Sequence, residues 1–324
     1  MTDDDDFLTD AFRRQLGGLV TPEAIRAIER GSDATELWRS LDESGFADAM
    51  LPESAGGAGL GLAQAFPLIL AAGEYCVPAP FAETMVARAM LGEQGVAPPS
   101  GAAILLAPAS AVLPGAGLAS HALVDRDGVP TLVAIQVSGD DLFRLRCATA
   151  IEQGEVLGLL APDADRLMLS AAAVTSALMA GAMGRVLEMS LRHAGERQQF
   201  GRSLGKFQAI QQQLAVLAEQ VLSAQVAARN AFVGTTFELA RVAAAKCRAN
   251  EAASHVCNIA HAIHGAIGAT EEFDLQLYTR RLKLCQLAFG SESYWGARLG
   301  HARIASGLDL TSDFLRLRLG AEMN

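Results

Sequence analysis

The stretch from residue 196 to residue 211 constrains the fold of this chain more than any other segment. It reads Glu-Arg-Gln-Gln-Phe-Gly-Arg-Ser-Leu-Gly-Lys-Phe-Gln-Ala-Ile-Gln, and we call it the seam. Apolar residues recur at helical spacing before it, from Leu178 to Met189, and after it, from Phe207 to Val221. Glycines, an aromatic residue and cations lie between the two patterns, which suits a sharp connection whose backbone amides can meet an anion. The sequence therefore predicts two long helices joined by a short charged turn.

The net charge of the chain limits the classes of molecule that it is expected to bind. The formal net charge is -10 at pH 7 over 324 residues, which argues against nucleic acid or an anionic membrane as the main partner. A local cluster of cations can still bind an anionic cofactor, and the seam holds Arg197, Arg202 and Lys206. A chain of this length has room for two or three domains with substantial cores.

Cysteine usage and the N-terminus predict a cytoplasmic protein. The five cysteines are scattered and form no Cys-x-x-Cys pair, which is typical of reduced, mostly buried thiols. The acidic run from Asp3 to Asp6 is the opposite of a basic signal-peptide start. No apolar run is judged long enough to cross a membrane.

The first half of the chain suggests a helical domain followed by a small β domain. We expect an N-terminal helical domain over 1–100, with an amphipathic helix within 7–30 and another beginning at Thr35 and ending near Gly45. Residues 101–169 contain short β-type runs at 103–106, 122–124 and 131–137, broken by Gly, Pro and Asp, and are predicted to form a reduced β domain.

The last part of the chain, residues 170–324, is predicted to be a bundle of antiparallel helices and the oligomer interface. We expect helices over 170–196, 206–231, 236–264, 271–287 and 291–306. Gly265 and Gly268 separate the third helix from the fourth. The predicted fold class is therefore mainly α.

Two sets of residues resemble the acyl-CoA dehydrogenase family. Arg197-x-x-Phe200-Gly201 followed by Phe207-Gln208-x-x-Gln211 is similar to the connection between the first two helices of the family's C-terminal bundle. The spacing of Trp38, Gly45, Pro52-Glu53 and the glycines at 56, 57 and 59 resembles the opening of its N-terminal domain.

The resemblance implies where FAD would bind. In the family, the bundle connection leaves its own subunit and touches the pyrophosphate and adenine side of FAD held by a neighbour, and the glycine-rich turn at 262–268 does the same. The residues implied as cofactor contacts are Arg197, Gln199, Phe200, Gly201, Leu204, Phe207, Gln208, Gly265, Ala266 and Ser291. For Ser291, capping of the last predicted helix is an equal alternative. Ala262 replaces the family's usual flavin-binding glutamine.

The resemblance also implies that the catalytic base is missing. Phe289 holds the position where the family has the glutamate that removes the α-proton, and phenylalanine cannot abstract a proton. The alternative position on the first bundle helix falls near Val174 or Thr175. Glu292, one helical turn past Phe289, is interpreted as an acid in the first turn of a helix.

The middle domain lacks the family's Thr-Glu-x-x-Ala-Gly-Ser and Trp-Ile-Thr-Asn-like segments, which hold the flavin ring. The chain therefore resembles the smaller, base-less subunit of the heteromeric acyl-CoA dehydrogenases of steroid-degrading actinobacteria. This implies FAD shared with a larger catalytic subunit, an acyl-CoA substrate, and an electron-transfer flavoprotein or similar acceptor.

Several alternatives stay open. Arg197 could cap helix carbonyls and Phe200 could be a core residue. The pairs His261 with His264, and Glu251 with His255, could share a helix face, but the further ligands of a di-iron bundle are not found, so no metal is predicted. The chain could instead be a homo-oligomeric dehydrogenase with an unrecognised base, or a flavin-free scaffold.

Overall fold

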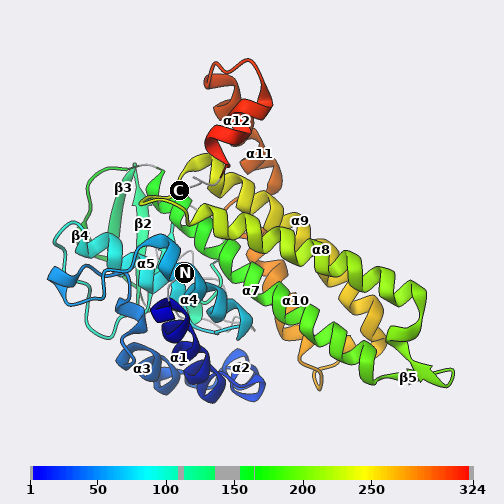
Figure 1. Cartoon of the computed structure of the whole chain (residues 1–324). Coiled ribbons are helices and arrows are strands. Elements are labelled where there is room, and N and C mark those ends of the chain that lie inside the picture. The colour runs from blue at the N-terminus through cyan, green and yellow to red at the C-terminus, as the bar shows by residue number, and fades with distance from the viewer. Residues whose placement is uncertain (1–2, 109–112, 136–153, 164, 321–324) are drawn as a thin grey trace.

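The computed structural model describes residues 3–108, 113–135, 154–163 and 165–320. Helices form most of it, together with one four-stranded sheet and a small hairpin (Figure 1). This confirms the predicted mainly-α fold. The domain boundaries at 100 and 169 remain a prediction.

Five helices form the N-terminal part: α1 (Asp3–Leu19), α2 (Pro22–Glu29), α3 (Thr35–Glu43), α4 (Leu62–Glu74) and α5 (Phe81–Gly92). The expectation of one helix within 7–30 was wrong, because the chain breaks between α1 and α2. The Thr21 hydroxyl accepts a hydrogen bond from the Ala24 amide at 3.2 Å, and Pro22 occupies the first turn of α2. Threonine capping and proline both start a new helix here.

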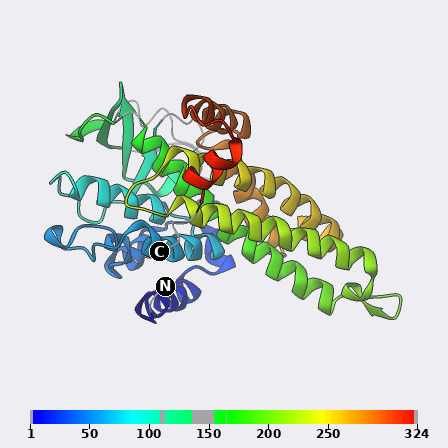
Figure 2. The same ribbon diagram turned by 45° about the horizontal axis from the view of Figure 1, so that its top comes forward.

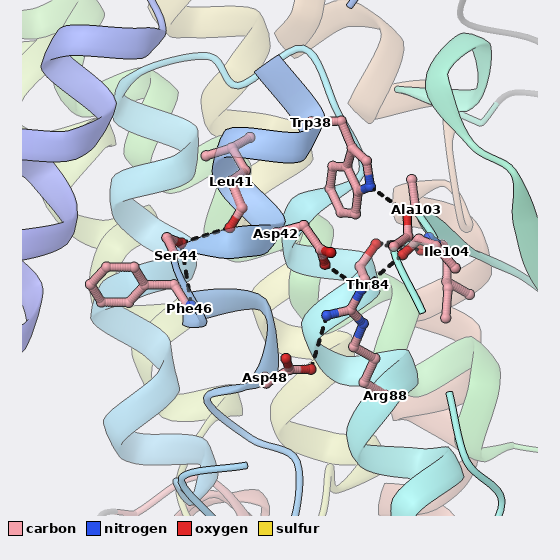
Figure 3. Close-up of polar contacts among 12 residues, drawn as sticks. Trp38, Leu41, Asp42, Ser44, Phe46, Asp48, Thr84, Arg88, Ala103 and Ile104 are labelled. Carbon is pink, nitrogen blue, oxygen red and sulfur yellow. Dashed lines mark hydrogen bonds and ion pairs between the residues drawn. The ribbon is translucent and has the colours of Figure 1, made fainter. Parts of the chain in front are cut away.

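A buried arginine joins these helices to the sheet. Arg88 on α5 is 4% exposed, and its guanidinium donates to Asp42 at 2.5 Å and to Asp48 at 2.9 Å (Figure 3). It also donates to the carbonyl oxygen of Ala102 at 3.1 Å. The Thr84 hydroxyl, one turn earlier on α5, accepts from the Ile104 amide at 2.8 Å. The start of the sheet is therefore fixed against α5.

The sheet contains β1 (Ile104–Ala107), β2 (His121–Arg126), β3 (Val129–Ala134) and β4 (Glu155–Leu159), in that spatial order. β1 pairs with β2 in parallel, whereas the other two pairs are antiparallel. Strands lie at all three predicted β runs, although Gln136 and Val137 lie outside the described residues. β4 was not predicted.

The remaining helices are α7 (Arg166–Glu196), α8 (Gln208–Ala231), α9 (Leu239–His264), α10 (Leu275–Leu287), α11 (Glu292–Ala305) and α12 (Thr311–Arg318). The five predicted helices are confirmed with ends shifted by at most four residues, and α12 was missed. α7, α8 and α9 run together as long rods away from the sheet (Figure 2).

Small residues bring the first bundle helix close to the N-terminal helices. A Cβ at Gly181 on α7 would lie 2.0 Å from the carbonyl oxygen of Leu70, and one at Gly73 on α4 would lie 2.2 Å from that of Leu178. The two backbones therefore touch directly, and only glycine fits at either position.

α7 corrects the expectation that no segment is long enough to cross a membrane. Within the described part of the chain it is the one helix whose length and apolar composition would allow a membrane span. In its most apolar window, however, 83% of the residues are buried inside the fold. Its apolar character is accounted for by its place at the centre of the protein.

Candidate functional site

The seam folds into a hairpin at the far end of the bundle (Figure 1). After α7 ends at Glu196, β5 (Gln198–Gln199) pairs with β6 (Arg202–Ser203), and a 3-10 turn, η4 (Leu204–Lys206), leads into α8. Phe200 and Gly201 form the two-residue turn with φ values of 50° and 78°. Positive φ at both positions is the geometry of a tight hairpin turn, and Gly201 supplies it without strain.

The hairpin presents an aromatic side chain to solvent. Phe200 is 90% exposed, so it is not a core residue of this chain. The Arg202 guanidinium lies 4.0 Å from the centre of the Phe207 ring, and the Phe200 ring meets the Phe207 ring edge-on at 6.2 Å. The Leu204 amide donates to the Arg197 carbonyl at 2.9 Å, which closes the base of the hairpin.

A groove of about 450 Å³ lies where the seam meets the end of α9. Among its lining residues are Arg197, Gln199 and Leu204 from the seam, together with Gly265 and Ala266 from the turn after α9. The structure therefore brings five of the ten predicted cofactor residues into one concave surface. Residues more than 60 positions apart in the sequence share this surface.

The other five predicted residues lie outside the lining of the groove. Phe200 and Gly201 form the hairpin tip, Phe207 lies under Arg202, and Gln208 begins α8. Ser291 caps α11, where its hydroxyl accepts a hydrogen bond from the Tyr294 amide at 3.2 Å.

The charge of the groove comes from Arg197. Its side chain is exposed, and within the described residues no acceptor binds its guanidinium; its backbone amide, by contrast, donates to the His193 carbonyl. His193 and His264 stack beside it with ring centres 4.5 Å apart. Burial lowers the pKa of both imidazoles below the usual histidine value, so both are neutral at pH 7. The groove therefore combines a cation that no described residue pairs with largely apolar walls.

His264 is packed beside the glycine-rich turn. It is 5% exposed, and its Nδ1 lies 2.8 Å from the carbonyl oxygen of Ala260. Among the described residues, no group of three His, Cys, Asp or Glu side chains is placed to hold a metal ion.

None of the three positions considered for a base offers a carboxylate to the groove. Phe289 is 3% exposed with φ 54°, and its carbonyl oxygen accepts from the Trp295 indole at 2.8 Å. Val174 and Thr175 are buried in α7. Glu292 lies in the first turn of α11, as expected, and accepts from the Gln286 side chain at 3.3 Å.

A polar ladder that the sequence reading missed holds the turn around Phe289. Lys246 on α9 is fully buried, and its ammonium donates to Asn250 at 2.7 Å and to the Cys285 carbonyl at 2.9 Å. The Asn250 amide group in turn donates to the carbonyl oxygen of Gly290 at 3.3 Å. The sequence feature that could have indicated this network is the spacing of Lys246 and Asn250, four residues apart in an alanine-rich helix.

Sequence reasoning also missed a buried carboxyl group. Glu83 on α5 is 6% exposed, and burial raises its pKa to about 7. It lies in a separate cavity between α4, α5, α7 and α10, away from the groove.

Comparison with known proteins assigns the family. Residues 164–301 match the family model described as acyl-CoA dehydrogenase, C-terminal domain. The chain is 32% identical over 276 residues to acyl-CoA dehydrogenase IpdE2 of Mycolicibacterium smegmatis, which covers 81% of this chain and 86% of that protein. The chain belongs to the acyl-CoA dehydrogenase family. It is therefore an oxidoreductase of a family that generally binds FAD.

Solved structures of acyl-CoA dehydrogenases share the fold of this family member. One is the Tcur3481-Tcur3483 steroid ACAD G363A variant, with a TM-score of 0.80, 24% identity, and coverage of 94% of this chain and 98% of the other. Another is the ChsE4-ChsE5 complex from Mycobacterium tuberculosis, with a TM-score of 0.77, 20% identity, and coverage of 96% and 99%. The predicted resemblance to the acyl-CoA dehydrogenase family is thereby confirmed, and the chain shares its fold with these two structures.

Proposed function

We propose that this chain is one subunit of a heteromeric, FAD-dependent acyl-CoA dehydrogenase. It would complete the cofactor site of a larger catalytic subunit without supplying the catalytic base. The complex would act on an acyl-CoA thioester in the cytoplasm and pass electrons to an electron-transfer flavoprotein or a similar acceptor. The names of the two heteromeric structures with the same fold support the paired assembly.

The groove between the seam and the turn after α9 carries this proposal. An FAD molecule has an anionic pyrophosphate and an aromatic adenine. The groove offers Arg197, which none of the described residues pairs, beside apolar walls. The Gly265 backbone at φ 65° has no atom within 4 Å of where a Cβ would be, so a ligand can approach the main chain there. These residues fit an anionic dinucleotide.

The role of each residue follows from its place. Arg197 would bind the pyrophosphate by charge-assisted hydrogen bonds, and Leu204, Ile210 and Ala266 would exclude water from the ring system beside it. The chemistry that FAD would supply when held there is acceptance of the hydride from the β-carbon of the acyl group. The α-proton must go to a carboxylate of the partner, because Phe289 and Thr175 offer none.

The exposed hairpin supports an intersubunit position for this groove. The hairpin lies at the far end of the bundle from the sheet (Figure 2). Phe200 at its tip is 90% exposed, and Gln199 beside it lines the groove. A large aromatic residue exposed on a tight, closed hairpin is typical of a surface that another subunit covers.

The test is the visible absorption spectrum and native mass of the chain purified alone and then co-purified with the product of its neighbouring gene. We expect a colourless protein alone and a yellow complex of two unlike subunits. A yellow homo-oligomer that reduces its flavin with an acyl-CoA would overturn the proposal and require a base in this chain. A colourless complex would favour a flavin-free scaffold instead.

A further inference from the structure

A narrow cavity lies where the N-terminal helices meet the bundle. Its free volume is about 30 Å³, which is room for roughly two water molecules. Most of its lining is apolar, and the polar groups among the lining residues are Glu83 from α5, Thr175 from α7, Arg281 from α10, and the thiols of Cys76 and Cys285. The cavity is distinct from the groove beside the seam and has no part in the proposed function.

Glu83 is an unusual group to find there. It is 6% exposed, and among the described residues no other residue donates a hydrogen bond to its carboxyl group. Its position in the first turn of α5 gives it its own backbone amide as a partner. Burial of an ionised carboxylate costs free energy when few hydrogen bonds replace those it made with water. Burial therefore raises the pKa of Glu83 to about 7.

Arg281 is the cation among the residues that line the cavity with Glu83, and its contact with Glu29 is long. Its Nη1 donates to the Val77 carbonyl oxygen at 3.1 Å, whereas its Nη2 lies 4.0 Å from Glu29. The carboxylate of Glu29 makes its short contact, 2.6 Å, with Arg280 instead. Arg281 is therefore a partly buried cation that a second anion can attract.

The other titratable groups around the cavity do not change their protonation state at neutral pH. Burial raises the pKa of the Cys76 thiol, and it raises that of Cys285 to about 11, so both are neutral. Tyr278 donates its hydroxyl proton to the Glu74 carbonyl, and burial raises its pKa as well. Lys246 is bound to the carbonyl oxygen of Cys285 and stays protonated below its pKa of about 8. Glu29, Arg280 and Arg281 form an ion cluster at one side.

We propose that Glu83 is an internal proton-binding site whose ionisation transfers Arg281 from Glu29 to the cavity. With the proton bound, the carboxyl group is neutral and shares the cavity with water, and Arg281 stays with Val77 and Glu29. When the proton leaves to solvent, the carboxylate attracts the guanidinium, and Glu29 keeps Arg280 alone. The contact between α5 and α10 thus depends on a proton.

The experiment is an infrared titration of the full chain between about pH 5 and pH 9 that follows the C=O stretch of a protonated carboxyl group. We expect this band to disappear near neutral pH in the wild type and to be missing at pH 6 in Glu83→Gln. A Glu29→Gln variant should lower the midpoint by about one unit, because it releases Arg281 to the ionised Glu83. Arg281→Met should raise the midpoint by at least about one unit.

The matched control is Glu188→Gln, which removes an exposed carboxylate that pairs with Arg185 and Arg192 outside the cavity. It should leave the band unchanged. If Glu83→Gln does not fold, the wild type and the Glu29→Gln variant still decide the matter. A wild-type spectrum without a protonated carboxyl band above pH 6 would overturn the proposal, as would a midpoint unaffected by Glu29→Gln. Neither result depends on flavin or on a partner subunit.

Discussion

The imidazole rings of His193 and His264 stack with their centres 4.5 Å apart, and they join the end of α7 to the end of α9. Phe273 lies against both rings, 5.1 Å from that of His264 and 6.1 Å from that of His193. This aromatic contact holds the seam and the glycine-rich turn side by side. The groove proposed to meet FAD exists because these two segments are held together here.

Replacement of Arg197 by alanine should weaken the retention of FAD in the heteromeric complex. A charge-assisted contact to phosphate is worth roughly 1.5–3 kcal/mol, which corresponds to a loss of affinity of about tenfold to a hundredfold. The measurement is flavin fluorescence on dilution of the complex. Arg192→Ala is the control, because Arg192 lies one turn earlier on α7 and pairs with Glu188. Equal flavin retention in both variants would contradict the role of Arg197.

Replacement of Phe200 by serine should weaken assembly with the partner while it leaves the isolated chain folded. The ring is 90% exposed, so its removal costs little packing within this chain. Burial of an aromatic ring at an interface is worth roughly 1–3 kcal/mol, and sedimentation velocity at falling concentration would show the loss. Melting temperatures of the isolated variant and wild type should agree within about 2 °C. A large drop would mean that the ring supports the hairpin itself.

Replacement of Gly181 by alanine should destabilise the chain by about 1–3 kcal/mol, because the new methyl group would lie 2.0 Å from the carbonyl oxygen of Leu70. Gly195 on the same helix is the matched control, since nothing lies within 4 Å of its Cβ position. Gly195→Ala should be neutral or stabilise by up to about 1 kcal/mol through helix propensity. Urea unfolding of the two variants compares them directly. Equal midpoints would refute the close packing of α4 on α7.

Lys246 should make the stability of the chain rise with pH above about 8. Burial lowers its pKa from 10.5 to about 8, so the folded state favours the neutral amine. Between these two pH values the unfolded state binds more protons, and the free energy of unfolding therefore increases with pH, by about 3 kcal/mol in total. The measurement is urea unfolding from pH 7 to about pH 10.5 for the wild type and Lys246→Met.

The Lys246→Met variant should lack this part of the pH dependence, since methionine does not titrate. The difference between the two slopes isolates the lysine from the cysteines and tyrosines that titrate in the same range. Parallel curves would mean that the ammonium is not held in the buried position described above.

The helices of the bundle were predictable because their apolar residues keep helical spacing over many turns, and glycines mark their ends. The split between α1 and α2 was also readable, since Thr21 and Pro22 together start a helix. β4 was not, because its residues are mostly exposed on both faces and lack the alternation of a half-buried strand.

Prediction of the site was limited in a different way. Recognition of the motif singled out Arg197, Gln199 and Gly265 individually, whereas their meeting in one groove depends on how α7, α8 and α9 pack. The environment of Glu83 includes residues of α7 and α10, which are distant in sequence, so no local pattern indicates that its carboxyl group is buried. The sequence left both a cofactor contact and a helix cap open for Ser291, and the structure shows the cap on α11.

The hairpin tip has a consequence for a cell that makes this protein. Without a partner subunit, the chain exposes the Phe200 ring on a protruding turn, where other apolar surfaces can bind to it. Production of the two subunits in unequal amounts would leave the surplus of this one prone to aggregation and proteolysis. A need for balanced synthesis of the proposed pair would follow from the exposure of a single side chain.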